Sequence, residues 1–432
     1  MALRPSLLAA TTLTIGVLAT CPARADALAD DIQAALTHGT PNLELRPRIE
    51  VVSPDNSKTD ALALTMRMVM GYTTKPIYGL SASAEMLAVM VPLNAYNSQV
   101  NGKTSYAQIS DPPGINLGQG ILRYQKAWGP EGIDVKAGRQ VIALDDQRFF
   151  GKSDFRQNYQ SIDSVLTKVT PFDHFSVLGG WGWNIKNALD NSVPSRIVIG
   201  QATYAPLPAL TVDGFGYFYA NQSEILYSDP QQIQSLGVPN CGLKIPKKVK
   251  SFAGCDNEIY GGRARGKFTL TPDLDLTYKA TYAHQAPYEG GSALIDADLV
   301  QAKLKLIWRG IDLGGEYMLL GSNATGTYGF QTLQSTKHLF NGWAELFQTT
   351  PNNGLQTLAT SLSIPIGRTT LYGKYYNFHS DYGNIHDGDE IDVSLGYSFT
   401  KHIKGAIEFA DYMPAHFGVH TNLAYAYLSV KY

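Results

Sequence analysis

Charged and apolar residues alternate strictly from Leu43 to Val51, near the start of the chain. The two sets of positions are Glu44, Arg46, Arg48 and Glu50 against Leu43, Leu45, Pro47, Ile49 and Val51. Successive side chains of a β-strand point to opposite faces. The pattern therefore predicts a strand with one apolar face and one fully charged face.

The same period of two recurs along the rest of the chain. In Ile391–Phe399, large apolar residues alternate with polar or small ones. We count about 18 such segments, and 16 would also suit the even strand number of a closed barrel. They begin near residues 42, 60, 78, 117, 133, 160, 174, 196, 209, 258, 273, 294, 311, 355, 369, 389, 402 and 422. So many short alternating segments predict an all-β protein.

The connections between these segments alternate between short and long. Thr170–Asp173 and Pro365–Arg368 are short, whereas Val91–Asn116 and Asn221–Asn257 are long. Tight turns at one end and long loops at the other are typical of a transmembrane β-barrel, whose turns face the periplasm and whose loops face outside. We therefore expect residues 42–432 to form a single antiparallel transmembrane barrel, with both termini at the periplasmic end.

The first 25 residues have the features of a signal peptide. Arg4 gives a positive start, an apolar stretch follows, and residues 23–25 (Ala-Arg-Ala) fit the small-x-small rule for cleavage. Residues 26–41 would then be a short periplasmic segment, too short for a plug domain, which argues against a plugged receptor. The last alternating segment ends on the aromatic Tyr432 and resembles the final strand of outer-membrane proteins. The chain is predicted to reach the outer membrane of a Gram-negative bacterium.

The composition excludes several classes of protein. The formal net charge is -2, so there is no bulk basic field that would bind nucleic acid. After the signal peptide, no apolar run reaches the roughly 18 residues that a transmembrane helix needs. Charged residues are only 17% of the chain, and its 25 tyrosines and 41 glycines suit a barrel rich in turns and aromatic side chains.

Two cysteines remain after the signal peptide, Cys241 and Cys255. An exported chain lies in an oxidising compartment, where two nearby thiols usually pair. We therefore predict a disulfide between them, which would stabilise the fold by roughly 3 kcal/mol. No nearby histidine completes a metal site, and we expect neither a metal ion nor another cofactor.

The charged positions of the strands are expected to face the lumen, because an arginine facing lipid at mid-depth would cost roughly 2–4 kcal/mol. The candidate pore-lining and selectivity residues are Glu44, Arg46, Arg48, Glu50, Arg67, Arg263, Arg265, Lys267, Lys279, Lys303, Lys305, Glu390 and Asp392. The six basic residues from Arg263 to Lys305 fall on three consecutive segments and would form a basic wall. Such a wall would favour anions modestly at low salt. The alternative is that these charges pair with one another and only keep the lumen wet.

A charged loop, residues 144–158 (LDDQRFFGKSDFRQN), is a candidate constriction. Its charged candidates, with one residue just before it, are Arg139, Asp145, Asp146, Arg148, Asp154 and Arg156. Folded into the lumen, such charges would set selectivity. The alternative is an external, solvated loop.

Three stretches resemble motifs of the alginate-export family of outer-membrane channels. They are Gly138–Asn158 (GRQVIALDDQRFFGKSDFRQN), Phe330–Gln356 with its "KHLFNGWAE", and Tyr375–Phe399 with its "GDEID". Glu345 stands where the family usually has Asp, and Tyr376 and Asn377 stand where it more often has His and Asp. The resemblance implies an outer-membrane barrel channel. Some members of that family export an acidic polysaccharide.

The leading hypothesis for function is a channel that passes small polar or anionic solutes by passive diffusion, with outer-membrane lipid around it. The alternative is export of an anionic polysaccharide, which would need periplasmic partners. An enzyme is not expected, because the nine histidines are scattered and no serine-containing catalytic motif stands out. His416 and His420 share the last loop, but two ligands on a loop do not define a metal site.

Overall fold

The computed structural model describes residues 22–221 and 255–432, and these residues form one helix, one short 3-10 turn and 18 β-strands. The helix α1 spans Pro22–Thr37, and the 3-10 turn η1 spans Lys337–Leu339. The strands are β1 (Thr40–Pro54), β2 (Ala61–Thr73), β3 (Leu80–Ala95), β4 (Gly114–Trp128), β5 (Glu131–Gln140), β6 (Ser161–Phe172), β7 (Phe175–Lys186), β8 (Ser192–Leu207), β9 (Leu210–Asn221), β10 (Asn257–Thr271), β11 (Leu274–Pro287), β12 (Ala297–Trp308), β13 (Ile311–Leu320), β14 (Leu355–Ile366), β15 (Thr369–His379), β16 (His386–Ser398), β17 (Ile403–Pro414) and β18 (Thr421–Lys431).

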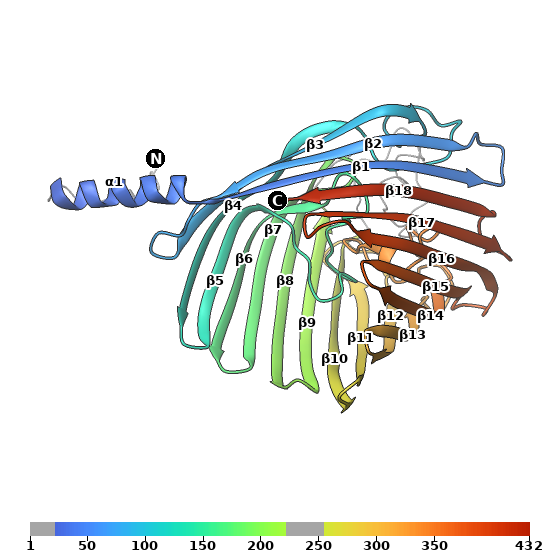
Figure 1. The fold of residues 1–432 in the computed structure, drawn as a ribbon. Helices are drawn as coiled ribbons and strands as arrows, with labels where there is room; N and C mark the ends of the chain where they lie inside the picture. The colour runs from blue at the N-terminus through green and yellow to red at the C-terminus, as the bar shows by residue number, and fades with distance from the viewer. Residues whose placement is uncertain (1–21, 222–254) are drawn as a thin grey trace, which may run out of the picture.

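The strands close into a single antiparallel barrel. Each strand pairs with its neighbour in the sequence, and β1 also pairs with β18, which closes the ring (Figure 1). Every strand begins within four residues of its predicted start. The predicted antiparallel barrel of 18 strands is therefore confirmed, and the 16-strand alternative is not needed. In the part of the chain described, no helix is long and apolar enough to cross a membrane.

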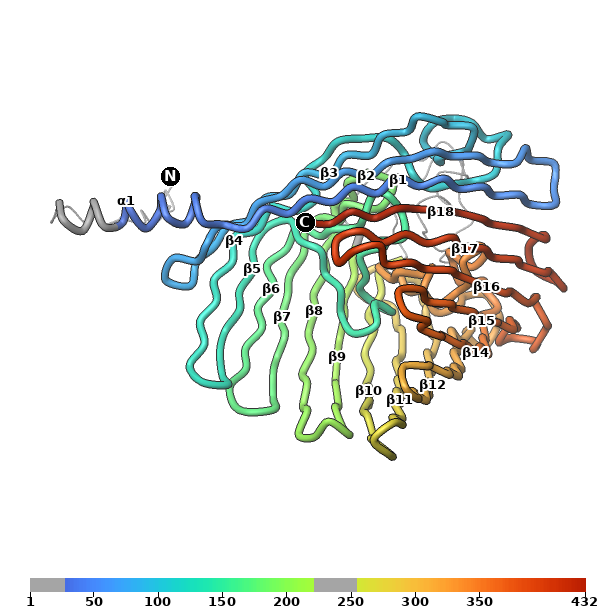
Figure 2. Tube along the Cα trace, in the orientation of Figure 1, coloured from blue at the N-terminus to red at the C-terminus, as the bar shows by residue number. Residues whose placement is uncertain are grey.

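The first strand begins and the last strand ends at the same end of the barrel, the end with the short turns. The backbone N–H of Leu43 donates to the carbonyl of Tyr432 at 3.0 Å, so the first and last strands meet there. Figures 1 and 2 show α1 projecting from the barrel at this end, near the C-terminus. The carbonyl of Ala35 accepts from the N–H of Lys75, just after β2, which fixes the end of α1 on the β2–β3 connection.

The faces of β1 follow the alternation in the sequence. Leu43 and Ile49 are 45% and 46% exposed on the outer surface, whereas Arg48 and Glu50 are only 2% and 1% exposed on the inner one. The register with β18 pairs Leu45 and Arg48 but passes over Pro47. Proline has no N–H to donate to a ladder, so it is tolerated where that ladder is interrupted.

Two long loops pack inside the barrel instead of standing outside it. We call residues 141–160 the crossing loop and residues 321–354 the companion loop. Phe149 of the crossing loop packs against Phe215 on β9 and Phe330 of the companion loop, with ring centroids 5.1 and 6.5 Å apart. All three rings are buried, so the lumen has an aromatic core of its own.

Candidate functional site

The crossing loop joins two opposite walls of the barrel. One of its ends is held by β1 and β2, and the other is held by β10, β11 and β12. In a ring of 18 strands, β1 and β10 lie half a turn apart. The loop therefore spans the lumen, where the sequence had placed a candidate constriction.

At the first wall, formed by β1 and β2, arginines donate hydrogen bonds mainly to the backbone carbonyls of the loop. Arg46 donates from Nη1 to the carbonyl of Asp154 at 2.7 Å and from Nη2 to that of Arg156 at 2.7 Å. Arg48 donates to the carbonyl of Phe155 at 2.6 Å, and Arg67 pairs with the Asp154 carboxylate at 2.7 Å. Arg46 and Arg48, which belong to the alternating stretch near the start of the chain, therefore anchor this loop.

At the second wall, the loop supplies the carboxylates and the strands supply the cations. Asp145 pairs with Arg263 at 3.0 Å, with Arg265 at 3.5 Å and with Lys279. Asp146 pairs with Lys279 at 2.7 Å and with Lys303 at 3.2 Å. Burial opposes the charge of Asp146, but Lys303 and Lys279 outweigh it and hold the pKa of that carboxyl below its ordinary value.

The predicted basic wall is therefore neutralised by its neighbours. Its six cations lie within ion-pair distance of six carboxylates: Asp145, Asp146, Asp213, Asp275, Asp312 and Glu316. Lys267 pairs with Asp275 at 2.7 Å, and Lys305 pairs with Asp312 at 3.1 Å. Glu316 also approaches a further cation, Lys374, at 3.4 Å. This geometry favours the alternative in which the lumen charges pair with one another.

The companion loop packs along the crossing loop. Gly151 donates its N–H to the carbonyl of Gln334 at 2.8 Å, and Thr336 donates to that of Gln147 at 3.1 Å. Arg148 is fully buried: its guanidinium lies 3.7 Å from the centre of the Phe340 ring, and burial lowers its pKa to about 10. The two loops thus form one unit across the lumen.

A buried charge network joins these loops to β1. Arg156 pairs with Glu50 on β1 at 3.2 Å and with Glu345 of the companion loop. Arg48 pairs with Glu50 at 2.9 Å and with Asp111 of the β3–β4 loop. Burial of Glu345 disfavours its charge, but Arg156 overrides this and lowers the pKa of Glu345 to about 2.

The remaining predicted site residues have partners on the barrel strands or in the companion loop. Glu44 pairs with Arg67 at 2.8 Å and with Lys431 at 3.2 Å. Glu390 accepts from the N–H of Ala344 at 2.8 Å, and Asp392 beside it is fully buried. Arg139 had been grouped with the loop, but it lies on β5 and pairs with Asp163 on β6 at 2.7 Å. It is a wall residue that joins two neighbouring strands.

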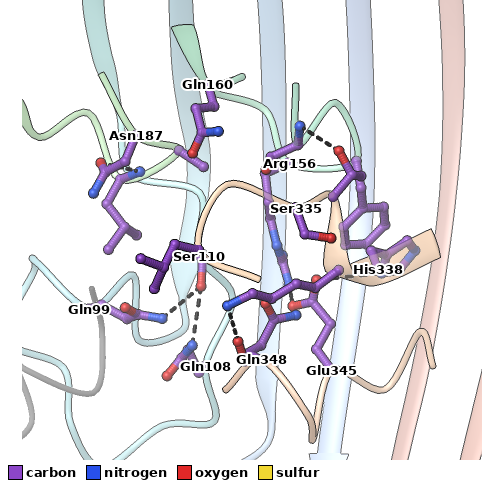
Figure 3. A pocket seen from close by; sticks show the side chains of 17 residues that line it. Gln99, Gln108, Ser110, Arg156, Gln160, Asn187, Ser335, His338, Glu345 and Gln348 are labelled. Atoms are coloured by element: carbon purple, nitrogen blue, oxygen red, sulfur yellow. Dashed lines mark hydrogen bonds and ion pairs between the residues drawn. The ribbon is translucent and has the colours of Figure 1, made fainter. Parts of the chain in front are cut away.

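Two cavities lie above and below this pair of loops. The outer cavity has a volume of about 160 Å³ and lies among the long loops, with Arg156, Ser335, His338 and Glu345 around it (Figure 3). The inner cavity has a volume of about 340 Å³ and is lined by Arg46, Arg48, Glu408 and Tyr425 of the barrel wall. A third cavity of about 250 Å³ lies against the lysine-rich wall of β11 to β15.

Several important residues were not predicted from the sequence. Asp111, His338 and Phe155 carry contacts at the constriction, yet none belongs to an alternating segment. The only available signal was the position of Phe155 in the charged loop and of His338 in the "KHLFNGW" motif. Cys241 lies outside the described residues, so the disulfide to Cys255 stays a prediction.

The histidines of the last loop have ordinary partners. The ring of His420 contacts the Asp411 carboxylate at 2.8 Å, and the ring of His416 contacts the carbonyl of His386 at 2.8 Å. Within residues 22–221 and 255–432, no three His, Cys, Asp or Glu side chains are grouped to hold a metal ion.

Solved structures share this barrel. Acinetobacter baumannii OccAB4 aligns over 91% of this chain and 99% of its own, with a TM-score of 0.65 and 13% identity. Pseudomonas aeruginosa OpdO aligns over 93% and 99%, with a TM-score of 0.67 and 12% identity. Pseudomonas aeruginosa OccK9 (OpdG) aligns over 92% and 100%, with a TM-score of 0.66 and 11% identity. Identity this low shows a shared fold.

The similar structures are outer-membrane porins of the Occ/Opd group. No protein-family model matches the chain, and no curated protein matches it either. The resemblance to the alginate-export family is not supported by these comparisons. The three motifs that carry that resemblance cover only a small part of the chain, whereas the alternating pattern that carries the barrel is common to porins of many kinds.

Proposed function

We propose that this protein is an outer-membrane channel that passes small polar or anionic solutes by passive diffusion. The observation that carries the proposal is a closed 18-strand barrel whose lumen is crossed by a pinned loop and keeps cavities with polar and charged walls on both sides of it. Its fold relatives are outer-membrane porins, which supports a location in the outer membrane of a Gram-negative bacterium.

The preference for anions should be weak. The basic wall is balanced by carboxylates, and Arg156 and Arg48 are each paired with acids. Arg46 differs, because among the described residues its partners are carbonyls and the Gln157 amide and include no carboxylate. A net positive charge in a narrow wet passage acts over a Debye length of about 8 Å at physiological salt, so the bias should fade as salt rises.

Conductance of the purified protein in planar bilayers tests the proposal. Stepwise ion currents with a small anion preference at low salt are expected. A protein that inserts as a barrel and carries no current would contradict it.

The polysaccharide-export alternative is less favoured by the geometry. The outer and inner cavities are small, and loops held by ion pairs at both walls separate them. Swelling of liposomes in solutions of small sugars, organic acids and an anionic oligosaccharide separates the two functions. Entry of the small solutes alone is expected, and equal entry of the oligosaccharide would favour the alternative.

The same proposal includes three further points. The protein is not an enzyme, it is exported by a signal peptide cleaved after Ala25, and residues 42–432 form the barrel. Helix α1 (Pro22–Thr37, 16 residues) runs across this boundary in the unprocessed chain, so cleavage would remove its first four residues and leave the rest at the periplasmic end. Mass measurement of the mature N-terminus tests this, with Asp26 as the expected first residue.

A further inference from the structure

The outer and inner cavities share part of their lining. Phe155 of the crossing loop and Thr336 and His338 of the companion loop border both of them. The separation between the cavities is therefore a single layer of side chains at this point. No other residue borders both cavities among those that line them in the described part of the chain.

Two aromatic rings fill this layer. Phe155 and His338 are stacked, with ring centroids 3.4 Å apart and planes 9° apart. Trp343 continues the stack beyond His338 at 5.8 Å and 7°, and Tyr425 of β18 meets the edge of Phe155 at 5.2 Å. Stacked rings fit closely and leave no room for a hydrated ion between them.

Thr336, the third residue of the layer, is held in place by hydrogen bonds. Thr336 accepts from the N–H of Ser153 at 3.0 Å through its hydroxyl, which also donates to Gln147 at 2.9 Å. The two rings are held by stacking, by the neighbouring aromatic rings and guanidiniums, and by a longer contact from His338 to Glu345 at 3.4 Å. If the layer opens, it opens at the rings.

Two guanidiniums lie close to the Phe155 ring. Arg156, which borders the outer cavity, has its guanidinium carbon 4.7 Å from the ring centre, and Arg48, which borders the inner cavity, has its own at 4.8 Å. Both guanidiniums also pair with Glu50 and approach Asp111, so they belong to one buried charge network beside the ring. His338 covers the ring by stacking, and the layer between the cavities is therefore formed by the two rings.

We propose that Phe155 and His338 are the size-limiting gate of the channel, and that solutes pass from the outer to the inner cavity only when these two rings part. The inference rests on the proposed channel function and adds to it the place where the path is narrowest. It also names the residues that decide which solutes are small enough. A small anion needs a brief separation of the rings, whereas a bulky one needs a longer and rarer one.

Single-channel recording of the full-length protein tests the gate, with chloride as the small anion and gluconate as the bulky one. Phe155→Ala and His338→Ala should each raise the conductance roughly twofold or more, with the larger gain for gluconate, because the two cavities become continuous. Leu339→Ala is the matched control: Leu339 neighbours His338 and borders the inner cavity but not the outer one. It should leave both conductances near those of the wild type.

A reversible chemical modification at position 155 gives a second test of the gate. Phe155→Cys should conduct like Phe155→Ala, and labelling with benzyl methanethiosulfonate should put an aromatic ring back and lower the current again. Leu339→Cys and the wild type, treated in the same way, are the baselines. Unchanged conductance in Phe155→Ala, His338→Ala and Phe155→Cys would overturn the gate. A wild-type barrel without any current would instead overturn the proposed function.

Discussion

Replacing Arg46 by alanine tests whether the charged face of β1 exists to hold the crossing loop. The side chain makes four hydrogen bonds to the loop, at 2.7 to 3.2 Å. Two of their acceptors have another arginine donor: the carbonyl of Phe155 also accepts from Arg48, and that of Arg156 from Arg67. The carbonyl of Asp154 and the amide of Gln157 lose their bond to this wall cation outright.

The magnitude follows from those two lost bonds. A hydrogen bond to a charged group contributes a net of about 1.5–3 kcal/mol, and water entering the vacated space would recover part of it. We expect the closed position of the loop to lose about 2–4 kcal/mol, which is roughly a 30-fold to 1,000-fold shift toward open positions at 1.4 kcal/mol per factor of ten. Single-channel recordings of Arg46→Ala should show a larger mean conductance and frequent brief closures.

Arg123→Ala is a matched control for the lost charge. Arg123 lies on β4 and forms two hydrogen bonds with Asp134 on β5 at 2.8 Å; within the described part of the chain it has no hydrogen bond or ion pair with the crossing loop. It removes one positive charge from the wall without releasing the loop, so its conductance should stay near that of the wild type. Arg46→Lys should fall between the two, because an ammonium replaces only part of the fork of donors. Equal conductance in Arg46→Ala, Arg123→Ala and the wild type would refute the anchoring role.

Three further predictions can be tested separately. The double substitution Arg263→Glu and Arg265→Glu should shift the reversal potential toward cation selectivity and raise the conductance. The new carboxylates would face Asp145 and Asp213 and release the loop from its second wall. An unchanged reversal potential and conductance would contradict this. Burial lowers the pKa of His338 from 6.5 to about 4, with Glu345, Arg156 and Arg48 facing the ring. The neutral ring stabilises the closed loops fully above pH 6.5, and this contribution, up to about 3 kcal/mol, is lost as the pH falls toward 4. Conductance should therefore rise between pH 6.5 and 4, less so in His338→Phe, and a flat profile in the wild type would count against it. Thiol titration of unfolded, non-reduced mature protein should find Cys241 and Cys255 paired, and two free thiols would rule the disulfide out.

Much of the barrel could be predicted from the sequence because lipid imposes a strict rule. The strands must present apolar side chains outward, so a period of two recurs along the chain, interrupted locally by β-bulges, and marks the number and faces of the strands. The contrast between outward Ile49 and inward Glu50 is an instance of that rule. Even Pro47 fits, because it sits where the ladder with β18 is interrupted.

The constriction could be predicted only in part. The alternation of residues along a strand shows which face of the barrel a side chain lies on, but not which residue it contacts. It places Arg46 and Arg263 in the lumen, but their partners in the crossing loop are more than a hundred residues away in the sequence. Seen without partners, these cations resemble a selectivity wall. In the structure both hold the crossing loop, and the carboxylates that neutralise Arg263 come from that loop and from the adjacent strand β9. The role of Phe155 and His338 depends on two loops that meet only in the folded chain.

The most direct test of the channel itself is the current–voltage relation of the purified mature protein in a planar bilayer with a tenfold salt gradient. The structure predicts single-channel steps and a reversal potential displaced slightly toward anions at low salt, with the displacement shrinking as both salt concentrations are raised. A folded barrel that gives no steps, or one with a strong cation preference at every salt concentration, would contradict the account.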